Sequence, residues 1–156
     1  MEIRKNISVW LVLQDGENKG KVALQKRSGG EKEFPYLCQS TWSGKVEPNE
    51  DIMEAVAREC KEEMGEEFAM KIDFQKLEFL TESTAVTNGV EWHCSNYFGE
   101  VSDAVIKTAK IHDDAFPDLI FVDKNTEIFS LKTNVDPKHK IVLFDDQYNI
   151  LKNILK

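Results

Sequence analysis

The chain has 156 residues, of which 41% are hydrophobic and 31% are charged. Its 28 Asp and Glu outnumber its 20 Lys and Arg, so the formal net charge is 20 − 28 = −8. This length predicts a single domain over residues 1–156, and the apolar share is too high for a disordered chain. The acidic excess argues against a protein that binds extended nucleic acid, because such proteins neutralise phosphates with Lys and Arg.

The sequence contains no sign of a membrane or secretory protein. No apolar run approaches the roughly 20 residues that span a bilayer, and the first residues do not form a signal peptide. The three cysteines, Cys38, Cys60 and Cys94, form no CxxC motif and have no spacing typical of a zinc site. We therefore expect a cytoplasmic protein with reduced thiols and no membrane partner.

The first third of the chain predicts strands and loops. Residues 3–13 form an apolar, partly β-branched run that ends at a turn over residues 15–20. Residues 22–27 follow at once, and we expect the two runs to form a hairpin whose second strand alternates apolar and polar side chains. Residues 28–33 predict a polar loop, and residues 34–44 a loop with a short strand.

The hydrophobic period becomes helical over residues 50–64, where Ile52, Ala55, Val56, Cys60 and Met64 fall on one stripe and Gly65 provides a stop. Further strands are expected over residues 76–81, 90–101, 119–122 and 126–131. Residues 102–118 are ambiguous, and residues 145–155 predict an amphipathic terminal helix. Strands on both sides of one central helix, with a helix at the end, predict a mixed α/β (α+β) sandwich.

Three carboxylates share one face of the predicted central helix. Glu59, Glu62 and Glu63 stand at positions i, i+3 and i+4, away from the apolar stripe. Like charges at this spacing oppose helix formation by about 0.2–0.5 kcal/mol per pair, so we expect a cation to balance them. Clustered carboxylate oxygens are hard ligands that suit Mg²⁺ or Mn²⁺ better than zinc.

Residues 44–66 resemble the Nudix box, whose pattern is G-x5-E-x7-R-E-U-x-E-E-x-G-U, with U a bulky apolar residue. All seven fixed positions are occupied, by Gly44, Glu50, Arg58, Glu59, Glu62, Glu63 and Gly65. Cys60 takes the first apolar position, whereas the last one holds the charged Glu66. The resemblance implies an α/β/α sandwich with a mixed sheet, in which the catalytic helix follows the box loop.

The resemblance also implies an activity, namely hydrolysis of a diphosphate bond in a nucleoside diphosphate linked to another moiety. Water would attack phosphorus beside one or more divalent cations, Mg²⁺ or alternatively Mn²⁺. By the resemblance, Glu59, Glu62 and Glu63 would be metal ligands, together with the backbone carbonyl of Ser43. Arg58 would hold the catalytic glutamates by charge-assisted hydrogen bonds, and Glu50 would help to bind or orient the attacking water.

The general base and the substrate contacts are less closely defined. The base is either one of the box glutamates or an acid on a later loop, for which Asp113, Asp114, Asp118 and Glu127 are the candidates. Arg27 and Lys45 are expected phosphate contacts. Trp42 stands where the family commonly has proline, and we expect it to shape the floor of the substrate pocket.

Two alternative functions stay open on the sequence. Phe34, Pro35 and Cys38 are similar to the approach segment of isopentenyl-diphosphate isomerase, although the catalytic cysteine of that enzyme is expected nearer to Trp42 or Ser43. A non-catalytic nucleotide-binding module is the other alternative, although such modules often lose box glutamates that are all present here. The identity of the small nucleotide or other diphosphate substrate, the number of metal ions and the oligomeric state, including a homodimer, are not defined.

Overall fold

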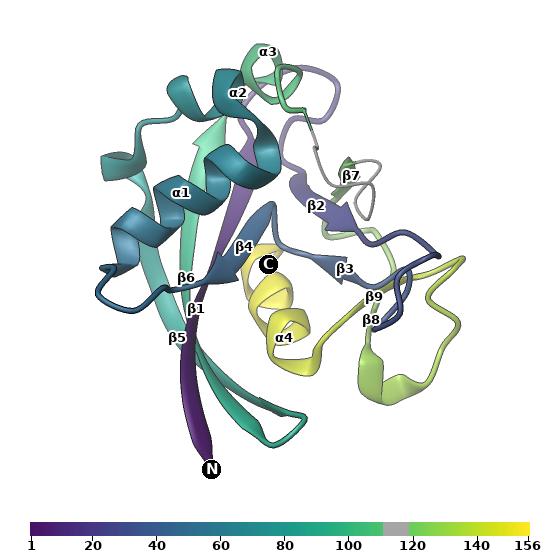
Figure 1. The fold of residues 1–156 in the computed structure, drawn as a ribbon. Coiled ribbons are helices and arrows are strands. Elements are labelled where there is room, and N and C mark those ends of the chain that lie inside the picture. The colour runs from purple at the N-terminus through teal and green to yellow at the C-terminus, as the bar shows by residue number, and fades with distance from the viewer. Residues whose placement is uncertain (111–118) are drawn as a thin grey trace.

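A computed structural model describes residues 1–110 and 119–156 of the chain. The fold is a mixed sheet flanked by helices (Figure 1). In chain order, its elements are β1 (Glu2–Leu13), β2 (Val22–Lys26), β3 (Cys38–Gln39), β4 (Trp42–Lys45), α1 (Ile52–Met64), α2 (Glu66–Met70), the 3₁₀ helix η1 (Phe74–Lys76), β5 (Glu78–Thr87), β6 (Val90–Val101), α3 (Asp103–Ile106), β7 (Leu119–Val122), β8 (Ile128–Ser130), the 3₁₀ helix η2 (Leu131–Thr133), β9 (Ile141–Leu143) and α4 (Asp145–Ile154).

Strand β1 is the centre of the main sheet, whose order is β3-β2-β1-β6-β5. It pairs with β6 in parallel along its whole length, from Glu2 opposite Val90 to Leu13 opposite Val101. It also pairs antiparallel with β4 and with β2, while β7 pairs with β2 and the parallel pair β8–β9 forms a separate small sheet. The expected mixed sheet is therefore confirmed.

The alternation of side chains along β1 divides the core between the two faces of the sheet. Ile7, Val9 and Leu11 pack in a buried cluster with α1, whereas Trp10 packs in a second cluster with Leu151 of α4. Figure 1 shows α1 and α2 on one side of the sheet and α4 on the other. Both faces of the central strand are therefore buried, which confirms the α/β/α sandwich.

The first hairpin is confirmed, because Leu11 of β1 lies opposite Ala23 of β2. The expected alternation of β2 is wrong, since Val22, Ala23, Leu24 and Gln25 are all buried. Strand β2 has partners on both edges and a core cluster on both faces. Residues 22–25 of a strand enclosed in this way have no solvent side, so the polar Gln25 is buried with the apolar residues.

Several boundaries differ from those expected from the sequence. The strand expected over residues 76–81 starts later and is longer, because residues 74–76 form η1 and β5 spans Glu78–Thr87. The strand over residues 90–101 and the terminal helix are confirmed, and none of the described helices has the length and hydropathy of a membrane span. The short elements α2 and β9 were not expected, and of the ambiguous stretch 102–118 only residues up to 110 are described.

Trp42 belongs to the core, which corrects its expected place in the substrate pocket. Its exposed fraction is 0%, and its ring packs edge-on against Phe68 and Phe74, with centroids 6.2 and 6.4 Å away. Its indole Nε1 donates a hydrogen bond of 3.0 Å to the carbonyl oxygen of Val56 in α1. A ring enclosed on every side cannot contact a substrate, so Trp42 instead fixes the box helix against β4.

The burial of Trp42 predicts a loss of stability on substitution. Trp42→Phe removes the indole donor and part of the ring volume, and we expect the free energy of unfolding to fall by about 1–3 kcal/mol. Urea unfolding followed by circular dichroism measures this change. Trp92→Phe is the matched control, because Trp92 is only partly buried and should cost clearly less. Equal effects of the two substitutions would contradict the assignment of Trp42 to the core.

Candidate functional site

The loop between β4 and α1 places the box carboxylates. Asp51 caps the helix, because its side chain accepts from the backbone N–H of Glu54 at 2.8 Å and the Glu54 side chain accepts from the Asp51 N–H at 3.2 Å. This reciprocal capping box satisfies two backbone donors that would otherwise lack partners. Glu50 lies directly before the cap, and its backbone N–H donates to the Glu47 carbonyl at 3.1 Å. The start of α1 is therefore well defined by local hydrogen bonds.

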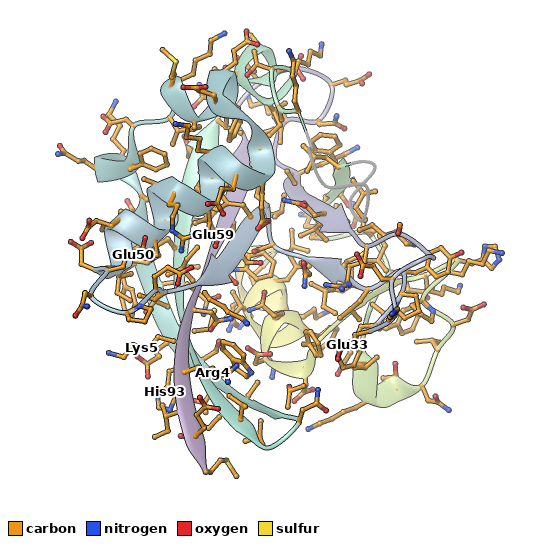
Figure 2. The ribbon with its side chains drawn as sticks, viewed as in Figure 1. Arg4, Lys5, Glu33, Glu50, Glu59 and His93 are labelled. Carbon is orange, nitrogen blue, oxygen red and sulfur yellow. The ribbon has the colours of Figure 1, made fainter. Side chains whose placement is uncertain are left out.

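Arg58 is the centre of the carboxylate cluster. Its guanidinium donates to both carboxylate oxygens of Glu50, at 2.8 and 3.0 Å, and to Oε1 of Glu59 at 2.8 Å. A longer bond of 3.3 Å reaches Oε2 of Glu62, and another of 2.8 Å reaches the backbone carbonyl of Lys45 in β4. The Arg58 guanidinium thus connects three box acids to strand β4 of the sheet. Figure 2 shows Glu50 and Glu59 near each other beside α1.

The surroundings of Glu50 and Glu59 shift the pKa values of these two acids in opposite directions. The hydrogen bonds from Arg58, helped by the Glu47 backbone N–H, lower the pKa of Glu50 from 4.5 to about 2. Burial raises the pKa of Glu59 above its ordinary value, although the hydrogen bond from Arg58 opposes the rise. Glu50 is therefore firmly ionised, whereas Glu59 is more basic than an exposed glutamate.

The box glycine is explained by contact with Glu59. A Cβ atom at Gly44 would overlap the Glu59 carboxyl group and its Cγ atom. Gly44 has an ordinary negative φ, so its small size, and not an unusual backbone, is what the site requires. The absence of a side chain at this position lets the Glu59 carboxyl group lie directly against β4.

Glu63 lies beside a different partner. Its Oε1 is 3.3 Å from the side-chain Nε2 of Gln25, a buried residue of β2. The fourth box acid is therefore in contact with the interior of the sheet, while Arg58 bonds to the other three.

A pocket of about 440 Å³ lies on the opposite side of β4 from the carboxylates. Gly44 pairs with Ile7, which belongs to the core cluster of α1, whereas Ser43 pairs with Ser8, which lines the pocket. Lys45 lines it as well. Strand β4 thus forms the boundary between the acidic cluster and the pocket. A larger cavity of about 540 Å³, at the other end of β6, includes no residue of the box.

The pocket combines cations with aromatic rings. Three of the residues expected at the site, Arg27, Ser43 and Lys45, line it together. The guanidinium carbon of Arg4 and the Nζ of Lys45 lie 5.7 and 5.6 Å from the centroid of the Trp92 ring. Cations next to a planar ring suit a ligand that carries both negative charge and a flat group.

Four other pocket residues, Arg4, Asn6, Ser8 and Phe144, were not expected from the sequence, and Phe34 was named only for the isomerase alternative. Phe34 and Phe144 make an edge-on contact at 4.8 Å at the pocket, and Arg4, Asn6 and Ser8 contribute from β1. The polar residues at every second position of β1 were the available signal. Their alternation lies within a run that otherwise indicates only a buried strand.

Several expected site residues lie elsewhere. Cys38 is 1% exposed, and burial raises the pKa of its thiol to about 11, so it is not available to an isomerase mechanism. Glu127 pairs with Lys140 at 3.4 Å and does not line the pocket. The other three candidate bases, Asp113, Asp114 and Asp118, lie outside the described residues.

Whether the box suits a metal ion depends on which side-chain atoms it offers as ligands. Within residues 1–110 and 119–156, no group of three or more His, Cys, Asp or Glu side chains is arranged to hold a metal ion. Arg58 contacts only one oxygen of Glu59 and one of Glu62, which leaves the second oxygen of each for another cation. Burial raises the pKa of the Cys60 thiol, so the box offers oxygen donors alone. In kind, these donors fit a hard divalent cation.

Comparisons with solved structures show which proteins have this fold. A NUDIX hydrolase from Alicyclobacillus acidocaldarius is 10% identical and has a TM-score of 0.69, with 99% of this chain and 92% of that chain covered. A MutT NUDIX hydrolase from Burkholderia pseudomallei is 20% identical, with a TM-score of 0.57 and coverage of 78% and 83%. An Ap4A hydrolase from C. elegans is 14% identical, with a TM-score of 0.53 and coverage of 78% and 81%.

The sequence itself gives a more direct assignment. No curated protein sequence matches the chain. The family model described as the NUDIX domain, in contrast, matches residues 4–142. This range includes the complete box, the strands that carry the pocket and the helix that carries the carboxylates. The chain therefore belongs to the NUDIX family.

Proposed function

We propose that the protein hydrolyses a diphosphate bond in a nucleoside diphosphate linked to another moiety, and that it requires Mg²⁺ or Mn²⁺. The observation that carries the proposal is the cluster of box carboxylates around Arg58, separated only by β4 from a pocket with cations and aromatic rings. Two proteins of the same fold are described as MutT NUDIX hydrolase and Ap4A hydrolase, and both names are compatible with a nucleotide substrate.

The pocket would bind the organic part of the substrate. A flat group can pack beside Trp92, while Arg27 and Lys45 attract the phosphates toward β4. Because β4 separates the pocket from the carboxylates, a substrate that extends across this strand brings its diphosphate bond to the acidic cluster. Burial of the organic group thus orients the reacting phosphorus.

The carboxylates of Glu59, Glu62 and Glu63 and the backbone carbonyl of Ser43 would hold the divalent cation. When bound, such a cation neutralises phosphate charge and lowers the pKa of the attacking water. Without it, the acidic cluster would repel a polyphosphate, so we expect substrate binding to depend on the cation.

The chain's own residues hold the reacting groups in place. Arg58 fixes Glu59 and Glu62, and Glu50 in turn fixes the Arg58 guanidinium. In the reaction, the water oxygen bonds to phosphorus, the bridging P–O bond breaks, and a carboxylate of the box or of a later loop accepts the proton.

We place this activity in the cytoplasm and on a small substrate. Support for the location comes from Cys38, Cys60 and Cys94, which are buried and form no disulfide. The acidic net charge supports a small ligand over extended nucleic acid.

The activity is tested on a panel of diphosphates. Nucleoside triphosphates, dinucleoside polyphosphates, nucleotide sugars, ADP-ribose and 5′-capped RNA are incubated with and without Mg²⁺, and products are separated by chromatography. We expect Mg²⁺-dependent turnover of at least one, and a loss of about 100-fold or more in Glu63→Gln. Glu66→Gln is the control, since Glu66 is exposed and is not assigned to the site.

Three outcomes would contradict the proposed reaction. The first is the absence of turnover on every compound, and the second is turnover that Glu63→Gln does not lower. The third is calorimetric binding of a nucleotide without product, which would favour the nucleotide-binding module. Isomerisation of a prenyl diphosphate would instead revive the isomerase alternative.

A second prediction concerns the space at Gly44. Gly44→Ala places a methyl group where the Glu59 carboxyl group lies, so Glu59 must shift. We expect kcat to fall by about tenfold or more, because small displacements of reacting groups are costly. Gly30→Ala is the control, since a Cβ there meets only Ser28 Oγ at 3.8 Å. Retention of full activity by Gly44→Ala would contradict a role for the observed Glu59 position.

A third prediction concerns acid stability. Glu50 has its pKa lowered from 4.5 to about 2, so its ionised form stabilises the fold above pH 4.5 and this contribution is lost as pH falls toward 2. We expect Glu50→Gln to be less stable at neutral pH and to lose less further stability over this range. Urea unfolding between pH 7 and 2 measures the free energy of unfolding of both proteins. Glu17→Gln is the control, because Glu17 is exposed. Parallel curves for Glu50→Gln and wild type would contradict the Arg58–Glu50 linkage.

A further inference from the structure

Gln25 is a buried amide that contacts the box helix from inside the sheet. It lies near the end of β2 and is 1% exposed. We propose that Gln25 is a positioning residue that orients the Glu63 carboxylate relative to the chain segment before the box. This inference rests on the proposed function and adds a residue outside the box to its machinery.

The amide nitrogen of Gln25 connects two parts of the site. Its Nε2 donates to the backbone carbonyl of Thr41 at 2.6 Å and to Oε1 of Glu63 at 3.3 Å. The sulfur of Met64 lies 3.6 Å from the same nitrogen. Thr41 precedes Ser43 by two residues, and Glu63 lies in the last turn of α1. Gln25 therefore links the approach to the box with the helix that carries its acids.

The orientation of this amide is determined by its neighbours. A flipped amide would place the Gln25 carbonyl oxygen 2.6 Å from the Thr41 carbonyl and next to the Glu63 carboxylate, where acceptors repel each other. In the observed orientation, Oε1 is buried and has no hydrogen-bond partner in the described part of the chain. A buried carbonyl without a partner destabilises the fold, so the donation to Thr41 and Glu63 outweighs this cost.

Thr41, which accepts the hydrogen bond from the Gln25 amide, is itself held in place by hydrogen bonds to neighbouring strands. Its backbone N–H donates to Val9 at 2.9 Å, and its hydroxyl donates to the Ala23 carbonyl at 2.7 Å and accepts from the Leu11 N–H at 3.0 Å. Thr41 is thus bonded to both β1 and β2. Gln25 therefore connects the Glu63 carboxylate to buried residues of β1 and β2.

Gln25 and Arg58 thus support different acids. Arg58 holds Glu50, Glu59 and Glu62 from the outer side of the helix, whereas Gln25 holds Glu63 from the sheet. At 1% exposure, Gln25 does not reach the substrate, so its effect must act through Glu63. Residues that orient metal-binding side chains from behind typically contribute 10- to 100-fold to metal affinity or activity, as an order of magnitude.

The contact itself is tested in the metal-free protein by NMR of the Gln25 side-chain amide. We expect Glu63→Ala to shift this resonance and to speed its exchange with water, because an acceptor is lost. Glu62→Ala is the matched control, since Glu62 is the neighbouring acid and bonds to Arg58. An unchanged Gln25 resonance in Glu63→Ala, or equal shifts in both variants, would overturn the proposal.

The functional role is tested with Gln25→Leu, which keeps the side-chain size but removes both N–H donors. We expect kcat to fall roughly 10- to 100-fold, with KM within about twofold of wild type, and the Kd for Mn²⁺ alone to rise about tenfold. Mn²⁺ binding is measured by electron paramagnetic resonance on protein shown to be folded by circular dichroism. Asn96→Ala is the structural control, because Asn96 is another buried amide, bonded to Trp10 and Ser83.

The results separate this inference from the proposed function. Wild-type kcat and Mn²⁺ affinity in Gln25→Leu would overturn the positioning role, as would equal losses in Asn96→Ala. If wild type binds Mn²⁺ but hydrolyses nothing in the substrate panel, the proposed reaction fails, while the NMR and Mn²⁺ measurements still decide for or against Gln25. If Gln25→Leu does not fold, the NMR comparison of Glu63→Ala with Glu62→Ala decides alone.

Discussion

The site depends on one interaction, the hydrogen bonding of the Arg58 guanidinium to Glu50, Glu59 and Glu62. Carboxylates spaced three and four residues apart on a helix repel each other, and the repulsion increases as they are withdrawn from water. Arg58 compensates for this repulsion with charge-assisted hydrogen bonds while leaving one oxygen of Glu59 and of Glu62 unused. Its further bond to the Lys45 carbonyl attaches the charged cluster to β4. The same residue therefore stabilises the helix and determines where the acids lie.

The sheet determines where the carboxylate cluster lies relative to the pocket. Successive residues of β4 face opposite sides, so Gly44 leaves room for Glu59 on one side while the side chains of Ser43 and Lys45 line the pocket on the other, where Gly44 also contributes to the lining. Because β1 is buried on both faces, its two sets of side chains can serve different purposes. Ile7 and its apolar neighbours hold α1, and the polar residues that alternate with them line the pocket.

The parts of the fold that depend on local sequence were predictable. The helical stripe with its glycine stop and the strand over residues 90–101 follow from spacing alone, whereas the contacts of Arg58 with the box acids were implied by the resemblance to the Nudix box. The burial of Trp42 and Gln25 was not predictable, because it depends on which elements pack over β4 and β2. The pocket could not be predicted from the sequence either, because it is formed by residues of β1, β4, β6 and α4 that are far apart in the chain. The predictions failed where burial depends on the position of a residue in the sheet and not on its type.

The proposed reaction requires the box carboxylates to hold a divalent cation at the diphosphate of a substrate seated beside Trp92. A crystal structure with Mn²⁺ and a non-hydrolysable diphosphate analogue of a substrate found in the panel is the decisive test, because anomalous scattering locates the manganese. We expect manganese bound to oxygens of Glu59, Glu62 and Glu63, with the phosphates between the manganese and the Arg27 and Lys45 side chains. Manganese bound only away from these three acids, or a diphosphate seated in the pocket with no metal at the box, would contradict it.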